Sequence, residues 1–217
     1  MDIPASEKIS AYSHGATIPV IAIGTIALVV ISAGDISTQI VSLVYGVSGV
    51  FLFFASFMYH AKKQAENGKT LWRKLDHTAI FFLIAGTYTP LCFLYLEGKM
   101  LWGILVAQWS LVVAGTLFKF FFINAPRALG TLTYLFMGWI VLIPIITLVE
   151  TMPRGGLVLL GTGGLSYTVG AVIYAVKRPN PLPGFFGFHE IFHLFISGGA
   201  VLHLAMLIYG VIDYQHS

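Results

Sequence analysis

Charged residues and cysteine are both scarce in this sequence. Only 10% of the residues are charged, against about 25% in an average soluble domain, and 57% are hydrophobic. Cys92 is the one cysteine, so the chain can form neither an internal disulfide nor a cysteine-based zinc site. Any metal must therefore be bound by histidines and carboxylates, and the composition excludes a soluble globular domain.

Long uncharged hydrophobic runs take up most of the chain. A helix needs about 20 apolar residues to cross about 30 Å of hydrocarbon, whereas barrel strands are shorter and alternate. We therefore predict an all-α fold, a seven-transmembrane helix bundle in which residues 1–217 form a single integral membrane domain. Pro90 and Pro144 should kink two of the helices. The predicted spans are residues 14–33, 39–60, 76–96, 100–122, 129–149, 156–176 and 187–211.

The few Lys and Arg residues are distributed unevenly among the loops. All of them except Lys99 and Arg154 fall on one side of the predicted spans. The positive-inside rule makes that side cytoplasmic, which places the N-terminus in the cytoplasm and the C-terminus outside. The net charge of +3 is therefore interpreted as a topology signal, and nucleic acid is not expected as a partner.

Three histidines, a carboxylate and a hydroxyl converge at the predicted cytoplasmic ends of three spans. His189 and His193 are about one helical turn apart, so on a helix both imidazoles can reach one zinc ion. His60, at the end of the second span, can supply a third ligand. Asp76 begins the third span, and Ser56 lies one turn before His60. We expect Zn²⁺ at the three histidines with one position left open, and Asp76 and Ser56 as the catalytic residues.

Each of these residues also has an ordinary structural explanation. An HxxxH pair often consists of two core histidines, Asp76 can pair with Arg73 or Lys74 at the surface, and Ser56 can be a small packing residue. However, ionisable groups on three helices at one membrane depth are costly unless they share a partner. Their conjunction therefore favours a metal site.

Polar residues outside this group have less specific explanations. His203 lies about 15 Å deeper than His193 along a helix, too far for the same ion, and is expected to be a buried hydrogen-bonding residue. Glu7, Ser10 and His14, in the pattern ExxSxxxH, share one helix face. They can brace the loops around the site, or they can serve as helix-cap and interface residues.

Five motifs distributed over the whole chain resemble one known family. They are ExxSxxxH at 7–14, SFMYH at 56–60, LDHTAIFFLIAGTYTP at 75–90, YLFMGW at 134–139 and HEIFHLFISGGAVLH at 189–203. The sequence resembles the hemolysin III family of bacterial membrane proteins, part of the progestin and adipoQ receptor family and related to the alkaline ceramidases. The resemblance implies seven helices, a cytoplasmic N-terminus and a zinc ion held by His60, His189 and His193. It also implies that Asp76 and Ser56 are partners of the zinc-bound water.

The leading functional hypothesis is a zinc-dependent hydrolase of a lipid amide or ester. It would act at the inner leaflet of the bacterial plasma membrane, with a membrane lipid as substrate and Asp76 as proton acceptor. The alternative is a non-enzymatic sensor or regulator of membrane state with a structural zinc. A cytolysin is a lesser alternative, because a compact bundle offers no route to secretion or to a pore in another cell.

Overall fold

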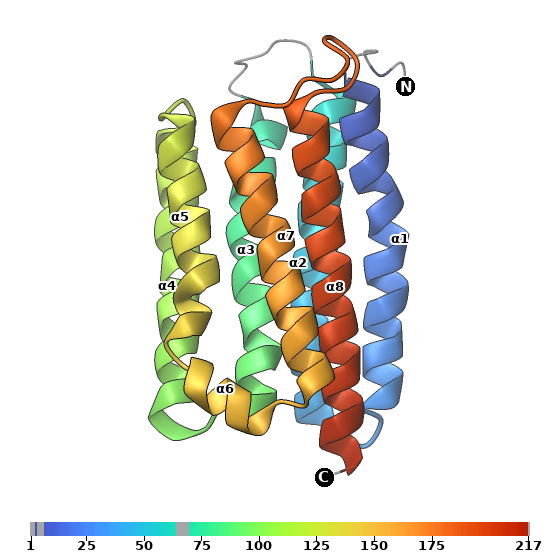
Figure 1. The fold of residues 1–217 in the computed structure, drawn as a ribbon, viewed down its shortest axis with the longest axis vertical. Helices are drawn as coiled ribbons and strands as arrows, with labels where there is room; N and C mark the ends of the chain where they lie inside the picture. Colours follow the sequence, from blue (N-terminus) through green and yellow to red (C-terminus); the bar gives the residue numbers. More distant parts are fainter. Residues whose placement is uncertain (1–2, 4–6, 64–69, 217) are drawn as a thin grey trace.

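Helices account for most of the molecule (Figure 1). The computed structural model describes residues 3, 7–63 and 70–216. These residues form no β-strand, so the predicted all-α fold is confirmed. In chain order the elements are α1 (Lys8–Ile31), α2 (Ile36–Ala61), α3 (Leu71–Tyr95), α4 (Gly98–Phe121), α5 (Arg127–Trp139), the 3-10 turn η2 (Ile140–Leu142), α6 (Ile145–Thr151), α7 (Arg154–Val176) and α8 (Phe188–His216).

Six helices, α1 to α4, α7 and α8, are each long and apolar enough to cross a membrane. The predicted span at 129–149 is not a straight helix, because α5 with η2 and α6 meet at an angle of 53°. Pro144 lies in that break, where its ring and missing N–H prevent the helix from continuing. By length and composition, the described residues therefore contain six candidate spans, or seven if the bent pair counts as one. Pro90, in contrast, lies inside α3 without ending it.

Three helices, α2, α3 and α5, begin at residues that satisfy or replace unpaired backbone donors. The Asp35 carboxylate accepts hydrogen bonds from the backbone N–H groups of Ser37 and Thr38 at the start of α2. Thr70 caps α3 in the same way through the N–H of Arg73. Pro126 directly precedes α5, at a position where no N–H is required.

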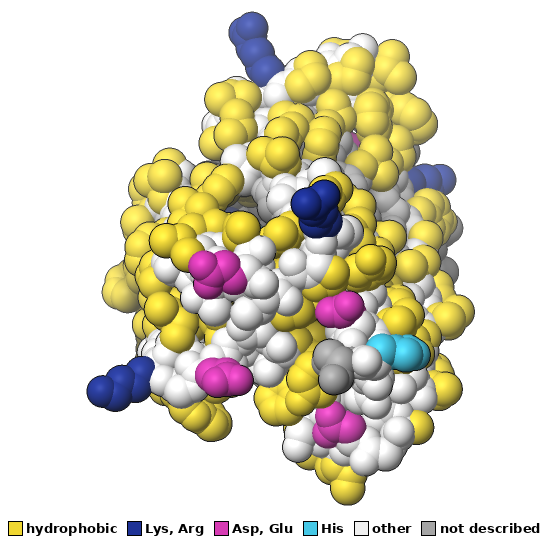
Figure 2. Space-filling view, turned by 60° about the horizontal axis from the view of Figure 1, so that its bottom comes forward, with side chains coloured by type: hydrophobic (Ala, Val, Ile, Leu, Met, Phe, Trp, Pro, Cys, Tyr) yellow, Lys and Arg dark blue, Asp and Glu magenta, His cyan; other side chains and the backbone are white. Residues whose placement is uncertain are grey.

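The helices form one bundle whose two ends differ in character. Along the bundle α1 packs on α2 and α8, α2 on α3, α3 on α4, and α7 on α8, whereas α5 approaches α7 and α3 only over short stretches. The starts of α1 and α3, the end of α2, and the α4–α5 and α7–α8 connections lie at the end we name the N-terminal end (Figure 1). The C-terminus and α6 lie at the opposite end, which is the one turned forward in Figure 2.

The opposite end carries acidic side chains among hydrophobic ones, as Figure 2 shows. Near the helix ends there, the acidic residues are Asp35, Glu97, Glu150 and Asp213. Most of the described Lys and Arg residues lie at the N-terminal end, in its connections and in the helix turns next to them. The two ends therefore differ in charge as the loop composition predicted.

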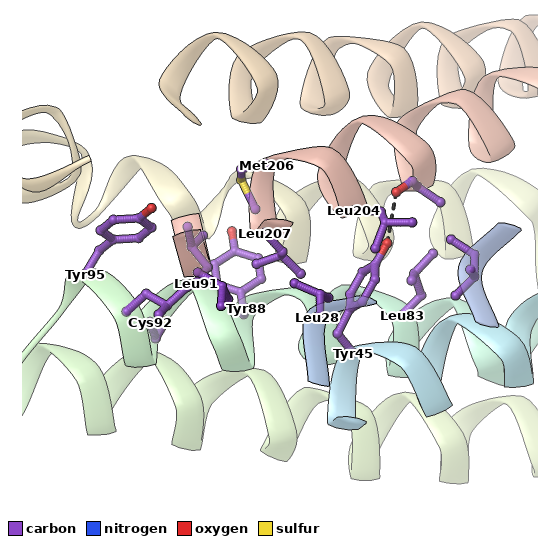
Figure 3. Packing of buried hydrophobic residues seen from close by; sticks show 14 of the residues in the cluster. Leu28, Tyr45, Leu83, Tyr88, Leu91, Cys92, Tyr95, Leu204, Met206 and Leu207 are labelled. Atoms are coloured by element: carbon purple, nitrogen blue, oxygen red, sulfur yellow. Dashed lines mark hydrogen bonds between the residues drawn. The ribbon is translucent and has the colours of Figure 1, made fainter. Parts of the chain in front are cut away.

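A continuous hydrophobic core fills the centre of the bundle (Figure 3). Tyr45 of α2 is fully buried, and its hydroxyl donates a hydrogen bond of 2.9 Å to the carbonyl of Ala200 in α8. This bond satisfies a polar group that would be costly to leave unpaired in a lipid-like interior. The surrounding side chains in Figure 3 include Leu28, Leu83, Tyr88, Leu91, Cys92, Tyr95, Leu204, Met206 and Leu207.

Candidate metal centre

Three imidazoles meet at the N-terminal end of the bundle. His60 lies in the last turn of α2, while His189 and His193 lie one turn apart at the start of α8. The Nε2 atoms of His60 and His189 are 3.5 Å apart, and one nitrogen from each of the three rings lies within 4.8 Å of the others. His60 and His193 are buried and His189 is half-buried. Together the three residues can hold a metal ion.

The distance between His60 and His189 fits a tetrahedral metal ion. Two imidazole nitrogens bound to zinc at about 2.0–2.1 Å are about 3.4 Å apart. The separation of 3.5 Å between His60 and His189 is close to that value. Nδ1 of His193 is buried and has no hydrogen-bond partner among the described residues. A buried imidazole nitrogen without a partner beside two other imidazoles fits a shared cation.

Glu7 fixes the orientation of His60. Its carboxylate lies 2.6 Å from Nδ1 of His60 and accepts a second hydrogen bond of 2.7 Å from Nζ of Lys63. Burial raises the pKa of Glu7, but the hydrogen bonds from His60 and Lys63 outweigh it and lower this pKa to about 2. Because an ionised carboxylate only accepts, Nδ1 carries the hydrogen and Nε2 presents its lone pair to the cluster.

Residues at the start of α1 brace the site. For the pattern ExxSxxxH, these contacts favour the bracing role over a helix-capping role. Glu7 precedes α1 but its side chain makes no capping hydrogen bond there. Ser10 donates a hydrogen bond of 3.1 Å to Glu190, whose other carboxylate oxygen accepts from the N–H of Gly187 at 2.8 Å. The start of α8, which carries His189, is therefore tied to α1.

His14 packs against the cluster without belonging to it. Its ring stacks on that of His193 with 3.9 Å between centroids and 27° between planes, and Phe53 meets it edge-on at 5.0 Å. His14 is buried, and neither ring nitrogen has a hydrogen-bond partner among the described residues. Sequence spacing gave no indication of this stacking, because it depends on how α1 crosses α8.

Asp76 and Ser56 lie beside the three histidines. Ser56 is buried on α2, one turn before His60, and Asp76 lies near the start of α3. Asp76 is close enough to Ser56, His60 and Arg73 to interact electrostatically with each. Both residues line the same cavity as His189 and His193. The structure therefore brings together all five residues that the sequence selected.

The cavity next to the cluster has a volume of about 760 Å³. It runs between α3, α5 and α7, where the short contacts of α5 leave space. Its apolar walls include Leu52, Ile80, Leu83, Leu135, Leu160 and Ile196. Its volume lies within the range of about 300–1,000 Å³ that is usual for small-molecule sites, so an acyl chain is a suitable occupant.

The remaining buried histidine lies away from the cluster. His203 is deeper along α8, where Nε2 donates a hydrogen bond of 3.3 Å to the carbonyl of Leu160. Its ring also meets that of Tyr167 edge-on at 5.3 Å. These contacts confirm the expectation of a buried hydrogen-bonding residue.

Comparisons with known proteins find relatives along most of the chain. The family model described as "Haemolysin-III related" matches residues 4–204. The chain is 36% identical to Hemolysin-3 of Bacillus cereus over 211 residues, which cover 96% of this chain and 91% of that protein. It is 34% identical over 209 residues to a Hemolysin-3 homolog of Bacillus subtilis (strain 168), with 94% of each chain covered. Identity to the monocyte to macrophage differentiation factor of Homo sapiens is 26% over 200 residues, 88% of this chain and 79% of the relative.

Proposed function

Because this chain belongs to the haemolysin III-related family, we propose that it is a zinc-dependent hydrolase of a lipid amide or ester. The observation that carries the proposal is the position of the cluster of His60, His189 and His193 beside an apolar cavity of about 760 Å³. A metal centre next to space for an acyl chain suits a substrate whose carbonyl lies at the membrane interface.

The chain supplies the groups that this chemistry needs. His60, His189 and His193 would hold the metal, which when bound acts as a Lewis acid on a carbonyl oxygen and lowers the pKa of water. Asp76 would accept a proton from the attacking water as its oxygen bonds to the acyl carbon. The bond to the ester oxygen or amide nitrogen then breaks, and the leaving group takes that proton. Ser56 would orient the water or the substrate.

The charges of the loops support an orientation for this reaction. Most basic residues lie in the connections and adjoining helix turns at the N-terminal end, which also contains the cluster. By the positive-inside rule this end faces the cytoplasm. The substrate would therefore be a lipid of the inner leaflet of the plasma membrane.

A structural role for the metal is the second candidate, and the contacts of α1 favour it. Glu7 joins the start of α1 to His60 of α2, and Ser10 joins α1 to Glu190 of α8. A metal on His60 and His189 would complete a clamp of three helices. In that case the protein would be a sensor or regulator of membrane state.

Metal analysis followed by a lipid panel tests the proposal. We expect about one zinc per chain in detergent-purified protein, lost when His189→Ala is combined with His193→Ala. His216→Ala is the matched control, since His216 is an exposed histidine of the same helix. The zinc-loaded protein should release fatty acid from at least one member of a panel of ceramides, acylglycerols and glycerophospholipids. Metal-free wild type, or zinc-loaded protein inactive on the whole panel, would contradict the hydrolase.

A further inference from the structure

A buried lysine lines the cavity beside the metal centre. Lys119, in the last turn of α4, is only 4% exposed, although lysines at helix ends normally extend to water. Its Nζ lies 5.8 Å from the ring centre of Tyr134 and 6.0 Å from that of Phe118. No carboxylate forms an ion pair with it in the described part of the chain. This ammonium group therefore has aromatic contacts and no compensating anion there.

Gly130 makes room for this ammonium group. A Cβ at Gly130 would come within 2.8 Å of Nζ of Lys119, so a larger residue would displace the lysine. Gly130 and Tyr134 both belong to α5 and line the same cavity. The short contacts of α5 leave the cavity open, and Gly130 of the same helix leaves space for the Lys119 ammonium group.

A second cation lines the same cavity as Lys119. Arg73, in the first turn of α3, lines the cavity and is close enough to repel Lys119 electrostatically. One of its guanidinium nitrogens, Nη1, donates a hydrogen bond of 2.8 Å to Oδ1 of Asn124. Arg73 also interacts electrostatically with the Asp76 carboxylate, which lies three residues further along α3. Lys119 is the buried cation that forms no ion pair among the described residues, and burying a charge without a partner is unfavourable. Lys119, with Arg73 lining the same cavity, is therefore suited to bind an anionic group.

We propose that Lys119 and Arg73 form a subsite for the phosphate of a glycerophospholipid whose acyl chain lies in the cavity. The inference rests on the proposed hydrolase and names its substrate class. Hydrolysis would add water across one acyl ester, breaking the acyl carbon–oxygen bond and giving a fatty acid and a lysophospholipid. Water is the only co-reactant.

The position of Arg73 favours a phospholipid over other lipids. Arg73 precedes Asp76 by three residues on α3, so their Cβ atoms are about 5–6 Å apart. The anion site therefore lies beside the proposed reaction site and is distinct from it. A ceramide has no anionic group, and the carboxylate of a fatty acid is its only polar group. A glycerophospholipid carries an ester carbonyl and a phosphate separated by a few bonds, as the two sites require.

Binding of pyrene-labelled lipids to the full chain in neutral detergent tests the subsite, with tryptophan-to-pyrene energy transfer as the readout. We expect Lys119→Gln to weaken binding of labelled phosphatidylglycerol about tenfold or more, since a hydrogen-bonded charge is lost. Labelled diacylglycerol, which lacks the phosphate, should bind the variant as it binds wild type. Arg73→Gln should have the same selective effect.

Two control variants separate charge from packing. Lys119→Arg keeps the charge and should retain most of the affinity, and Lys99→Gln removes an exposed lysine from the other end of α4. Unchanged phosphatidylglycerol binding in Lys119→Gln, or an equal loss for diacylglycerol, would overturn the proposal. An equal or larger loss for a labelled fatty acid would also overturn it, because the subsite would then bind carboxylates.

Measuring lipid hydrolysis by the wild type beside lipid binding separates this proposal from the hydrolase. Lys119-dependent binding by a zinc-loaded wild type that hydrolyses no lipid would leave the phosphate subsite standing and exclude the enzyme. Hydrolysis by wild type with no dependence of binding on Lys119 would keep the enzyme and remove the subsite.

Discussion

The Glu7 carboxylate lies 2.6 Å from Nδ1 of His60, so the residue before α1 is joined to the last turn of α2. Carboxylates that accept from the far nitrogen of a metal-binding histidine fix its tautomer and its ring orientation. Lys63 donates to the other oxygen of Glu7 and keeps this carboxylate ionised. Glu7, the N-cap residue of α1, therefore orients a histidine of the candidate metal centre.

Glu7→Ala should weaken zinc binding by about 10–100-fold, the usual effect of removing a carboxylate behind a metal-binding histidine. Competition with a fluorescent chelator measures the affinity. Lys63→Met is the matched control, because it removes the other partner of Glu7 and leaves the bond to His60 in place. Wild-type affinity in Glu7→Ala would mean that the carboxylate does not position His60.

His14→Phe should bind zinc as wild type does, because phenylalanine preserves the stacking on His193 and the edge contact with Phe53. His14→Ala should instead destabilise the protein by about 2 kcal/mol through the cavity that it leaves. Zinc content and thermal unfolding in detergent distinguish the two effects. If His14→Phe folded but lost its metal, His14 would be a ligand and the three-histidine assignment would be incomplete.

The sequence predicted the fold class and the cluster because both depend on short-range spacing. The length of the apolar runs determined where helices form, and the spacing of His189 and His193 placed both rings on one helix face. His60 could be added because topology put its helix end at the same depth. The break at Pro144 was expected as a kink, but its angle of 53° depends on the packing of α5 and α6.

The contacts between helices could not be predicted in the same way. Lys119 was counted as a topology signal, since no pattern in one sequence tells a solvated lysine from a buried one. Its burial follows from the position of α5 and from the space at Gly130. The pairing of Glu7 with His60 likewise depends on how α1 packs against α2, which the spacing of ExxSxxxH does not determine.

Asp35→Ala should destabilise the protein by about 1 kcal/mol, because the carboxylate caps α2 through the N–H groups of Ser37 and Thr38. Asp35→Asn should lose much less, since its carbonyl oxygen can accept the same bonds. Thermal unfolding in detergent gives the comparison. Equal melting temperatures for wild type and Asp35→Ala would show that the cap contributes nothing.

The cap should also be sensitive to pH. Hydrogen bonds from the Thr38 side chain, the Thr38 N–H and the Ser37 N–H hold the pKa of Asp35 below its usual value. A carboxylate with a lowered folded-state pKa contributes stability above its unfolded-state pKa of about 3.9, and this contribution is lost as the pH falls through the folded-state value. The difference in melting temperature between wild type and Asp35→Ala should therefore shrink below about pH 4. A constant difference down to pH 2 would contradict this linkage.

Asp76→Asn separates the two functional candidates. Asparagine has nearly the same shape as aspartate but cannot accept a proton, so a hydrolase should keep its zinc and its fold and lose about 10²–10⁴-fold in kcat. A structural metal would tolerate the change, because Asp76 is not among the three residues that meet at the cluster. Asp213→Asn, in the last turns of α8 at the opposite end, is the control for loss of an acidic group. The measurements are zinc content, melting temperature and release of fatty acid from the best lipid of the panel. Full turnover in Asp76→Asn would exclude it as the proton acceptor, and loss of zinc in a folded variant would assign it to the metal instead of to the attacking water.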